Sequence, residues 1–188
     1  NLEVKNVYET DGQAKKNIIP PKELQHITPT WGMRDANWFA NFPDSAKKVI
    51  EMFTENDGRP AVDGVITLTP TITSKILAVT GPVELSEYGK TLDSANFLAE
   101  IQEEVEYGEN RTEPKQILID FVPKFLEKLG GLEKEKWAEI FAILSEGVEQ
   151  KHILAYFKDQ AMEKVVLAGG FGGEIKKTEQ DYLSVVHT

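Results

Sequence analysis

The sequence has no cysteine, only three histidines and only three arginines among its 188 residues. The absence of cysteine excludes disulfide bonds, thiolate-bound zinc, iron–sulfur clusters and thiol catalysis. His26, His152 and His187 share no short spacing, so a histidine-based metal site has no sequence support. The chain also lacks any stretch of about 18 consecutive apolar residues, which is the length that a membrane-spanning helix needs.

Basic residues are outnumbered, with 21 Lys and Arg against 31 Asp and Glu and a net charge of −10. Nucleic-acid binding depends on Lys and Arg gathered on one face, so a nucleic-acid partner is not expected. A chain of this length buries about 70% of the surface that its unfolded form exposes. We therefore expect residues 1–188 to form a single domain that needs no disulfide or structural metal.

Apolar residues recur with helical and strand periods in alternation along the chain. The helices are expected at about residues 43–55, 70–80, 93–105, 112–129, 132–148 and 158–168. The strands are expected at residues 2–8, 62–68, 83–85, 152–157 and 182–186. Pro123 should kink or split its helix, because proline removes a backbone hydrogen bond. This order favours an α/β or α+β fold with a mixed β-sheet flanked by helices in three layers.

The inward faces of these elements predict the core. We expect the following side chains to be largely buried: Val65, Ile66, Leu68, Phe97, Ile101, Phe121, Phe141 and Ile153. The glycines at 169–173 follow a helix, whereas a dinucleotide-binding loop follows a strand and opens a helix. They are therefore interpreted as a helix stop.

A long connection before residue 43 holds Trp31, Arg34, Asp35, Asn37 and Trp38. Its aromatic residues predict an ordered segment at 28–42, with Trp31 or Trp38 at least half buried. One hypothesis is that Arg34 binds a phosphate or carboxylate, because a guanidinium forms planar two-point contacts with such anions. The alternative is that Arg34 and Asp35 only hold the loop together through backbone contacts.

Several motifs in this order resemble a bacterial family of domains of unknown function, which occur in large membrane-anchored envelope proteins. The motifs are Trp31-Gly-Met-Arg-Asp-Ala-Asn-Trp38, Asn41-Phe-Pro-Asp-Ser-Ala46, Val62-Asp-Gly-Val-Ile66, Thr69-Pro70 and Thr80-Gly-Pro-Val83. The resemblance extends from Val4 to Val186. It implies an extracytoplasmic location in the bacterial cell envelope, with membrane contact only through segments outside this chain. It further implies a fragment that lacks an upstream strand section and a C-terminal continuation.

This family is in turn distantly similar to the LytR–CpsA–Psr enzymes, which transfer glycopolymers from a polyprenyl pyrophosphate carrier to the cell wall. Arg34-Asp35 matches their Arg-Asp pair, and Arg111 with Gln116 matches what remains of their Arg-rich stretch. The similarity implies a LytR–CpsA–Psr-like fold and a cleft for a phosphorylated, lipid-linked glycan, with Mg²⁺ as a cofactor if the chain acts as a transferase.

The candidate ligand-binding residues are Arg34, Asp35, Asn37, Arg111 and Gln116, and no catalytic residue is assigned. The alternative is a non-catalytic structural or interaction domain that keeps the fold without the transferase chemistry.

Overall fold

The computed structural model describes residues 18–56, 59–108, 115–175 and 179. The strands expected at 2–8 and 182–186 lie outside these ranges, as does Arg111. No helix in the described part of the chain is long and apolar enough to cross a membrane.

The first half of the chain alternates short helices with short strands. A single 3₁₀ turn, η1, precedes α1, and α1 continues into a π-helical turn, η2. The elements are η1 (Met33–Asp35), α1 (Phe42–Glu51), η2 (Met52–Asn56), β1 (Gly64–Leu68), α2 (Pro70–Thr80), β2 (Val83–Leu85), η3 (Ser86–Tyr88) and β3 (Lys90–Leu92). Proline in the first turn pre-sets the helical φ of both α1 and α2.

The second half is mainly helical. Its elements are α3 (Phe97–Tyr107), α4 (Gln116–Gly130), η4 (Lys134–Lys136), α5 (Trp137–Glu149), β4 (Ile153–Phe157) and α6 (Gln160–Ala168). The six helices expected from the sequence are therefore confirmed, with boundaries shifted by a few residues. Pro123 does not split α4, which runs unbroken from 116 to 130 with the proline on its exposed side. The Asp159 carboxylate caps α6 by accepting from the backbone amides of Ala161 and Met162.

The described strands form two antiparallel pairs. β1 pairs with β4 from Gly64 opposite Phe157 to Leu68 opposite Ile153. β2 pairs with β3 across η3, where Gly89 takes a left-handed φ of 60° that closes the turn. The parallel pairing that a mixed sheet requires is absent among these strands. The expected combination of helices and strands is confirmed. The described strands do not form the mixed sheet that was expected between layers of helices.

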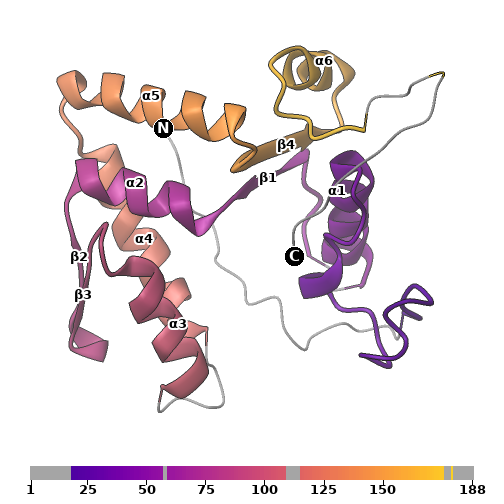
Figure 1. Ribbon diagram of the computed structural model, residues 1–188, viewed down its shortest axis with the longest axis horizontal. Coiled ribbons are helices and arrows are strands. Elements are labelled where there is room, and N and C mark those ends of the chain that lie inside the picture. The colour runs from indigo at the N-terminus through magenta and orange to yellow at the C-terminus, as the bar shows by residue number, and fades with distance from the viewer. Residues whose placement is uncertain (1–17, 57–58, 109–114, 176–178, 180–188) are drawn as a thin grey trace.

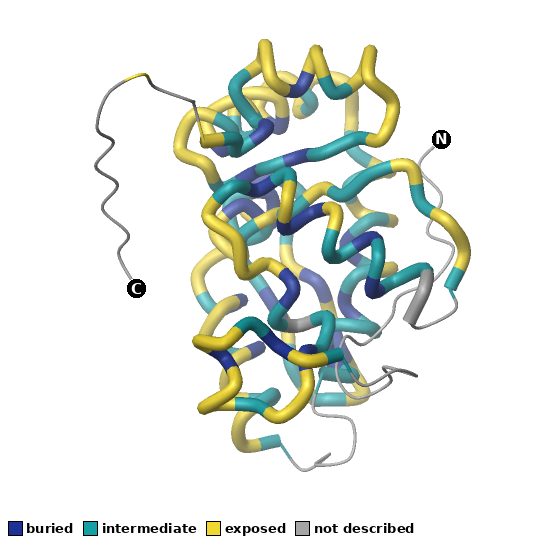
Figure 2. Tube along the Cα trace, turned by 90° about the vertical axis from the view of Figure 1, so that its right-hand side faces the viewer, coloured by how far each residue is buried: buried dark blue, intermediate teal, exposed yellow. Residues whose placement is uncertain are grey.

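The main core lies among the helices α2 to α5 and the β2–β3 hairpin (Figures 1 and 2). Phe121 of α4 is at its centre, with ring centroids 4.9 Å from Phe97 and 5.3 Å from Phe125. Figure 1 shows these helices on one side of the molecule and α1 on the other, with the β1–β4 pair between them. The antiparallel pair therefore joins two parts of the fold.

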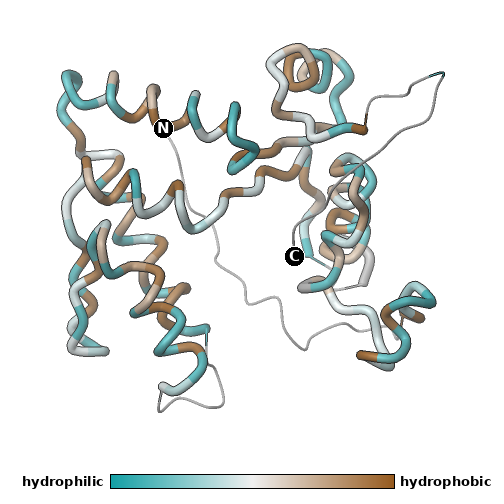
Figure 3. Tube along the Cα trace, viewed as in Figure 1, coloured by the Kyte–Doolittle hydropathy of each residue, from teal (hydrophilic) through white to brown (hydrophobic). Residues whose placement is uncertain are grey.

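Three residues expected in the core are exposed instead, namely Ile66, Leu68 and Phe141. Ile66 and Leu68 on β1 are 61% and 55% exposed, and Val65 is only partly buried. Each strand of this pair has a partner strand on one edge only. The helices α5 and α6 also pack against β4, so its apolar side chains are covered more than those of β1. Apolar residues nevertheless run along both strands of this pair (Figure 3). The prediction of a fully buried β1 is wrong for this reason.

Phe141 of α5 is 64% exposed. The buried side of α5 carries Ile140 and Gly147, and the next residue along a helix lies about 100° around its axis. Phe141 therefore leaves the core and packs beside Trp137, with the ring centroids 5.9 Å apart. Phe97, Ile101, Phe121 and Ile153 are buried as expected.

Phe121→Ala should lower the free energy of unfolding by about 3–5 kcal/mol, because it leaves a cavity between Phe97 and Phe125. Phe141→Ala is the matched control and should cost less than about 1 kcal/mol, since its ring is mostly in water. Urea denaturation followed by circular dichroism measures both values. Equal losses in the two variants would contradict the assigned core.

Candidate functional site

The loop before α1 is anchored by Trp31. This side chain is buried with Leu24, Ala36 and Met52 in a second, smaller core. Its indole Nε1 donates a 3.0 Å hydrogen bond to the backbone carbonyl of Asp35, and its backbone amide donates to Ile18. The buried tryptophan thus closes η1 onto the core from both directions, and the predicted burial of Trp31 is confirmed.

The far end of the same loop is held by Ser45 of α1. Its hydroxyl is fully buried and donates to the backbone carbonyl of Phe39 at 3.0 Å. The backbone amide of Phe39 donates to the hydroxyl oxygen of Ser45 at 2.9 Å. The buried hydroxyl thus acts both as hydrogen-bond donor and as acceptor, which fixes the chain at this point. The segment from 31 to 39, here called the Trp31 loop, is therefore tied down at each end.

Between these anchors the Trp31 loop presents polar and aromatic groups to solvent. Asn37 is exposed, and Trp38 and Phe39 are 41% and 40% exposed. The Phe39 ring lies edge-on to Trp31, with centroids 6.1 Å apart. The ammonium of Lys48 lies 5.2 Å from the centre of the Trp31 ring. An amide and two rings are thus displayed on a backbone that cannot easily rearrange.

The residues proposed from the sequence fall into separate regions. Asp35 and Asn37 lie in or beside η1, as does the backbone of Arg34, so these three share one loop. Gln116 begins α4, and Figure 1 shows α4 on the opposite side of the molecule from the segment before α1. Arg111 lies outside the described residues. The fold therefore groups Arg34, Asp35 and Asn37, and it separates Gln116 from them.

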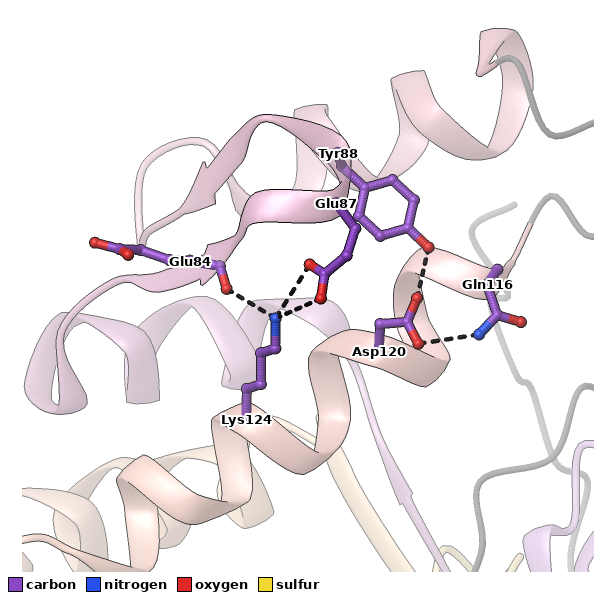
Figure 4. A network of polar contacts seen from close by, with 6 residues as sticks. All are labelled: Glu84, Glu87, Tyr88, Gln116, Asp120 and Lys124. Carbon is purple, nitrogen blue, oxygen red and sulfur yellow. Dashed lines mark hydrogen bonds and ion pairs between the residues drawn. The ribbon is translucent and has the colours of Figure 1, made fainter.

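Gln116 belongs to a network that fastens the β2–β3 hairpin to α4 (Figure 4). Its amide donates to Asp120 Oδ1 at 3.0 Å, while the Tyr88 hydroxyl donates to Asp120 Oδ2 at 2.7 Å. Lys124 donates to the backbone carbonyl of Glu84 and to both carboxylate oxygens of Glu87, at 3.2 to 3.3 Å. Gln116 therefore orients the carboxylate that Tyr88 binds, which is a structural role.

A groove of about 520 Å³ opens beside this network. Its lining includes the carboxylates of Glu87, Glu103 and Glu104 against the single ammonium of Lys90. Lys90 is itself paired with Glu100 at 2.6 Å and with Glu103 at 3.6 Å. The carboxylates of the lining would repel a negatively charged ligand, so the groove is poorly suited to a phosphate or pyrophosphate.

Protonation equilibria around this groove are shifted by their neighbours. Burial and the hydrogen bond to Asp120 raise the pKa of Tyr88 well above its ordinary value of 10. The hydrogen bond to Glu100 raises the pKa of Lys90. A backbone amide and the nearby Lys124 lower the pKa of Glu87. The shifts of Tyr88 and Glu87 favour the forms that hold the hairpin to α4, and the shift of Lys90 favours the form that holds it to α3.

Magnesium has no assembled site in the described part of the chain, because nowhere in it do three His, Cys, Asp or Glu side chains gather as metal ligands. Mg²⁺ is usually held by one or two carboxylates together with water and substrate phosphates. Asp35 supplies one carboxylate in the Trp31 loop. No metal-dependent step is therefore derived.

Tyr88→Phe should destabilise the fold by about 1 kcal/mol near pH 8, because Asp120 loses a donor. The raised pKa of Tyr88 stabilises the fold fully below the unfolded-state value of about 10, and this contribution is lost as pH rises beyond it. The difference between wild type and variant should therefore shrink between pH 8 and pH 11. Urea unfolding across this range measures it. A difference that grows with pH would contradict the assignment. Tyr107→Phe changes an exposed ring and is the control, which should leave the stability at pH 8 unchanged.

Trp31→Ala should speed native-state proteolysis within residues 28–42, because it removes both the buried ring and the bond to Asp35. Trp38→Ala should leave the cleavage rate close to that of the wild type, since its ring is substantially exposed. Mass spectrometry of timed digests locates the cuts. Equal acceleration in both variants would show that Trp31 is not the anchor.

The fold combines helices with small antiparallel sheets, and its best-defined exposed feature is the Trp31 loop. A family model described as "Protein of unknown function (DUF4012)" matches residues 4–106, and the chain belongs to this family. The match covers the Trp31 loop, α1, β1, α2 and the hairpin, and it ends within α3. Gln116 and Arg111 lie beyond it. No match is found among curated proteins or among solved structures.

Proposed function

We propose that the chain binds a phosphorylated, lipid-linked glycan through the Trp31 loop, as an extracytoplasmic domain of a bacterial envelope protein. The observation that carries this proposal is the exposure of Asn37, Trp38 and Phe39 on a backbone held by buried Trp31 and Ser45. The location is proposed from the resemblance to domains of membrane-anchored envelope proteins, and the lipid carrier from the expected similarity to the LytR–CpsA–Psr enzymes.

The chemistry of the loop suits a sugar. The C–H face of a pyranose packs against aromatic rings, and Trp38 and Phe39 offer such rings at partial exposure. The side-chain amide of Asn37 has both donors and an acceptor for sugar hydroxyls. Because the loop is anchored before any ligand arrives, little conformational entropy is lost on binding.

The phosphate part of the ligand is assigned to Arg34. A guanidinium contacts two phosphate oxygens at once, which the point charge of a lysine cannot do. Arg34 lies in η1, three residues after the Trp31 anchor and three before Asn37. The phosphate-binding group and the sugar-binding group thus belong to the same short segment.

Calorimetric titration with a polyprenyl pyrophosphate-linked disaccharide, and with the free disaccharide, tests the proposal. Trp38→Ala should weaken binding of both ligands by about tenfold. Arg34→Lys should weaken only the phosphorylated ligand. Phe141→Ala is the control, because it removes an even more exposed aromatic ring far along the chain, and it should change neither affinity.

Absence of saturable binding to either ligand would overturn the proposal. So would an equal loss in Trp38→Ala and Phe141→Ala, since that would indicate non-specific contact with exposed rings. Thermal unfolding of each variant separates a loss of binding from a loss of the fold.

A second candidate function is a non-catalytic interaction domain. The observation that favours it is the exposure of Ile66 and Leu68 on β1, whose outer edge has no partner strand among the described residues. Such an edge is a template for another chain. The two candidates separate in the same titrations, because an interaction domain without a glycan site should show no saturable binding of either ligand.

A further inference from the structure

We propose that a pocket between α1 and the end of β4 binds a phosphoryl group. The pocket has a volume of about 240 Å³, and Lys47, Tyr156 and Lys158 are among its lining residues. This volume is below the range of about 300–1,000 Å³ that is usual for drug-sized ligands. It suits a single anionic group with part of its hydration shell.

Two lysines line this pocket from different elements. Lys47 projects from α1, and its Nζ lies 5.8 Å from the centre of the Tyr156 ring. Its carboxylate partner, Asp44, is 3.6 Å away, with both side chains more than half exposed. Such exposed pairs are weak, so an incoming phosphoryl group competes readily for Lys47.

Lys158 enters from the end of β4. Its backbone amide donates a 2.8 Å hydrogen bond to the carbonyl of Asp63, which fixes this residue next to Tyr156. Its ammonium has no partner among the described residues. A second exposed lysine in the lining adds to the positive potential of Lys47, which favours an anion in this pocket.

The one carboxylate in the lining, that of Glu51, already forms an ion pair. Glu51 pairs with Lys48 at 2.5 Å, so much of its charge is compensated from outside the pocket. Thr54 donates its hydroxyl to the carbonyl of Ile50, whereas the hydroxyl of Tyr156 has no partner within the described part of the chain. The pocket therefore offers two cations and one neutral donor.

A phosphoryl group matches this set better than a carboxylate does. It carries up to two negative charges and three acceptor oxygens, one for each ammonium and one for the tyrosine. Lysine is a common phosphate ligand in proteins, acting as a point charge. In a protein with a net charge of −10, this local excess of positive charge is distinctive.

The pocket is separate from the Trp31 loop, and the proposal does not depend on glycan binding. Lys47 and Lys48 are consecutive on α1 but face different neighbours, since Lys48 lies over Trp31 and Lys47 lies over Tyr156. Trp38→Ala and Arg34→Lys should accordingly leave phosphoryl binding here unchanged.

A phosphoryl group can come from free phosphate or from a lipid headgroup, and the experiment tests each source separately. Inorganic phosphate is titrated at low ionic strength and followed by ³¹P NMR. Phosphatidylcholine vesicles with and without phosphatidic acid are tested by co-sedimentation. Lys47→Gln and Lys158→Gln should each weaken binding about tenfold in whichever arm shows it. Glu51→Gln should strengthen it a few-fold, because it removes the opposing charge and releases Lys48.

Lys164→Gln is the matched control, since Lys164 is an exposed lysine of α6 outside the pocket. Saturable binding that needs Lys47 and Lys158 but not Lys164 supports the proposal, and the responding arm identifies the source of the phosphoryl group. Binding that falls equally in all three lysine variants overturns it, as does the absence of saturable binding in both arms. Circular dichroism of the variants confirms that the fold is retained.

Discussion

The antiparallel pairing of β1 with β4 is the contact on which the rest of the arrangement depends. It joins residues 64–68 to residues 153–157 across most of the chain. Ile153 on β4 belongs to the main core, whereas Tyr156 lines the pocket beside α1. The same short ladder thus holds the helical core on one side and positions α1, with the Trp31 loop, on the other (Figure 1).

Close packing beside this ladder limits what it can accommodate. Gly147 of α5 lies where an added Cβ would come within 2.6 Å of the Ile72 side chain and 2.9 Å of the Ile153 side chain. Glycine inside a helix costs about 1 kcal/mol relative to alanine. That cost is offset here by the close approach of α5 to α2 and β4, which buries Ile72 and Ile153. A side chain at this position would force the Ile72 and Ile153 side chains to shift.

Much of the fold follows from local patterns. The periodicity of apolar residues located each described helix, because a helix stabilises itself through contacts three and four residues apart. The side chains of β1 could not be assigned in the same way, since Val65, Ile66 and Leu68 form a nearly continuous apolar run. Whether such a strand is covered depends on distant partners that no local pattern reports. The burial of Phe141 could not be predicted either, because the apolar residues of α5 cover a wider face than the part of the helix that is buried.

The candidate site was predictable only in part. The co-occurrence of Trp31, Arg34 and Asn37 in one segment located the loop, because residues close in sequence remain close in space. Pairing over longer distances was not visible: Tyr88 and Asp120 are 32 residues apart, and no spacing rule connects them. The grouping of Gln116 with Arg34 was unsupported for the same reason, since only the fold reveals that they lie apart. Lys47 and Lys158 likewise line one pocket only because the fold brings α1 beside β4.

The uncovered outer edge of β1 also has a consequence for behaviour at high concentration. Gly64 to Leu68 carries no charge, and an exposed, uncharged edge strand readily pairs with a second copy. The net charge of −10 keeps molecules apart in dilute buffer. This repulsion acts over about 10 Å at 0.1 M salt and over only about 3 Å at 1 M. The colloidal stability of this protein is therefore a property of its whole acidic surface, and it falls as the salt concentration rises.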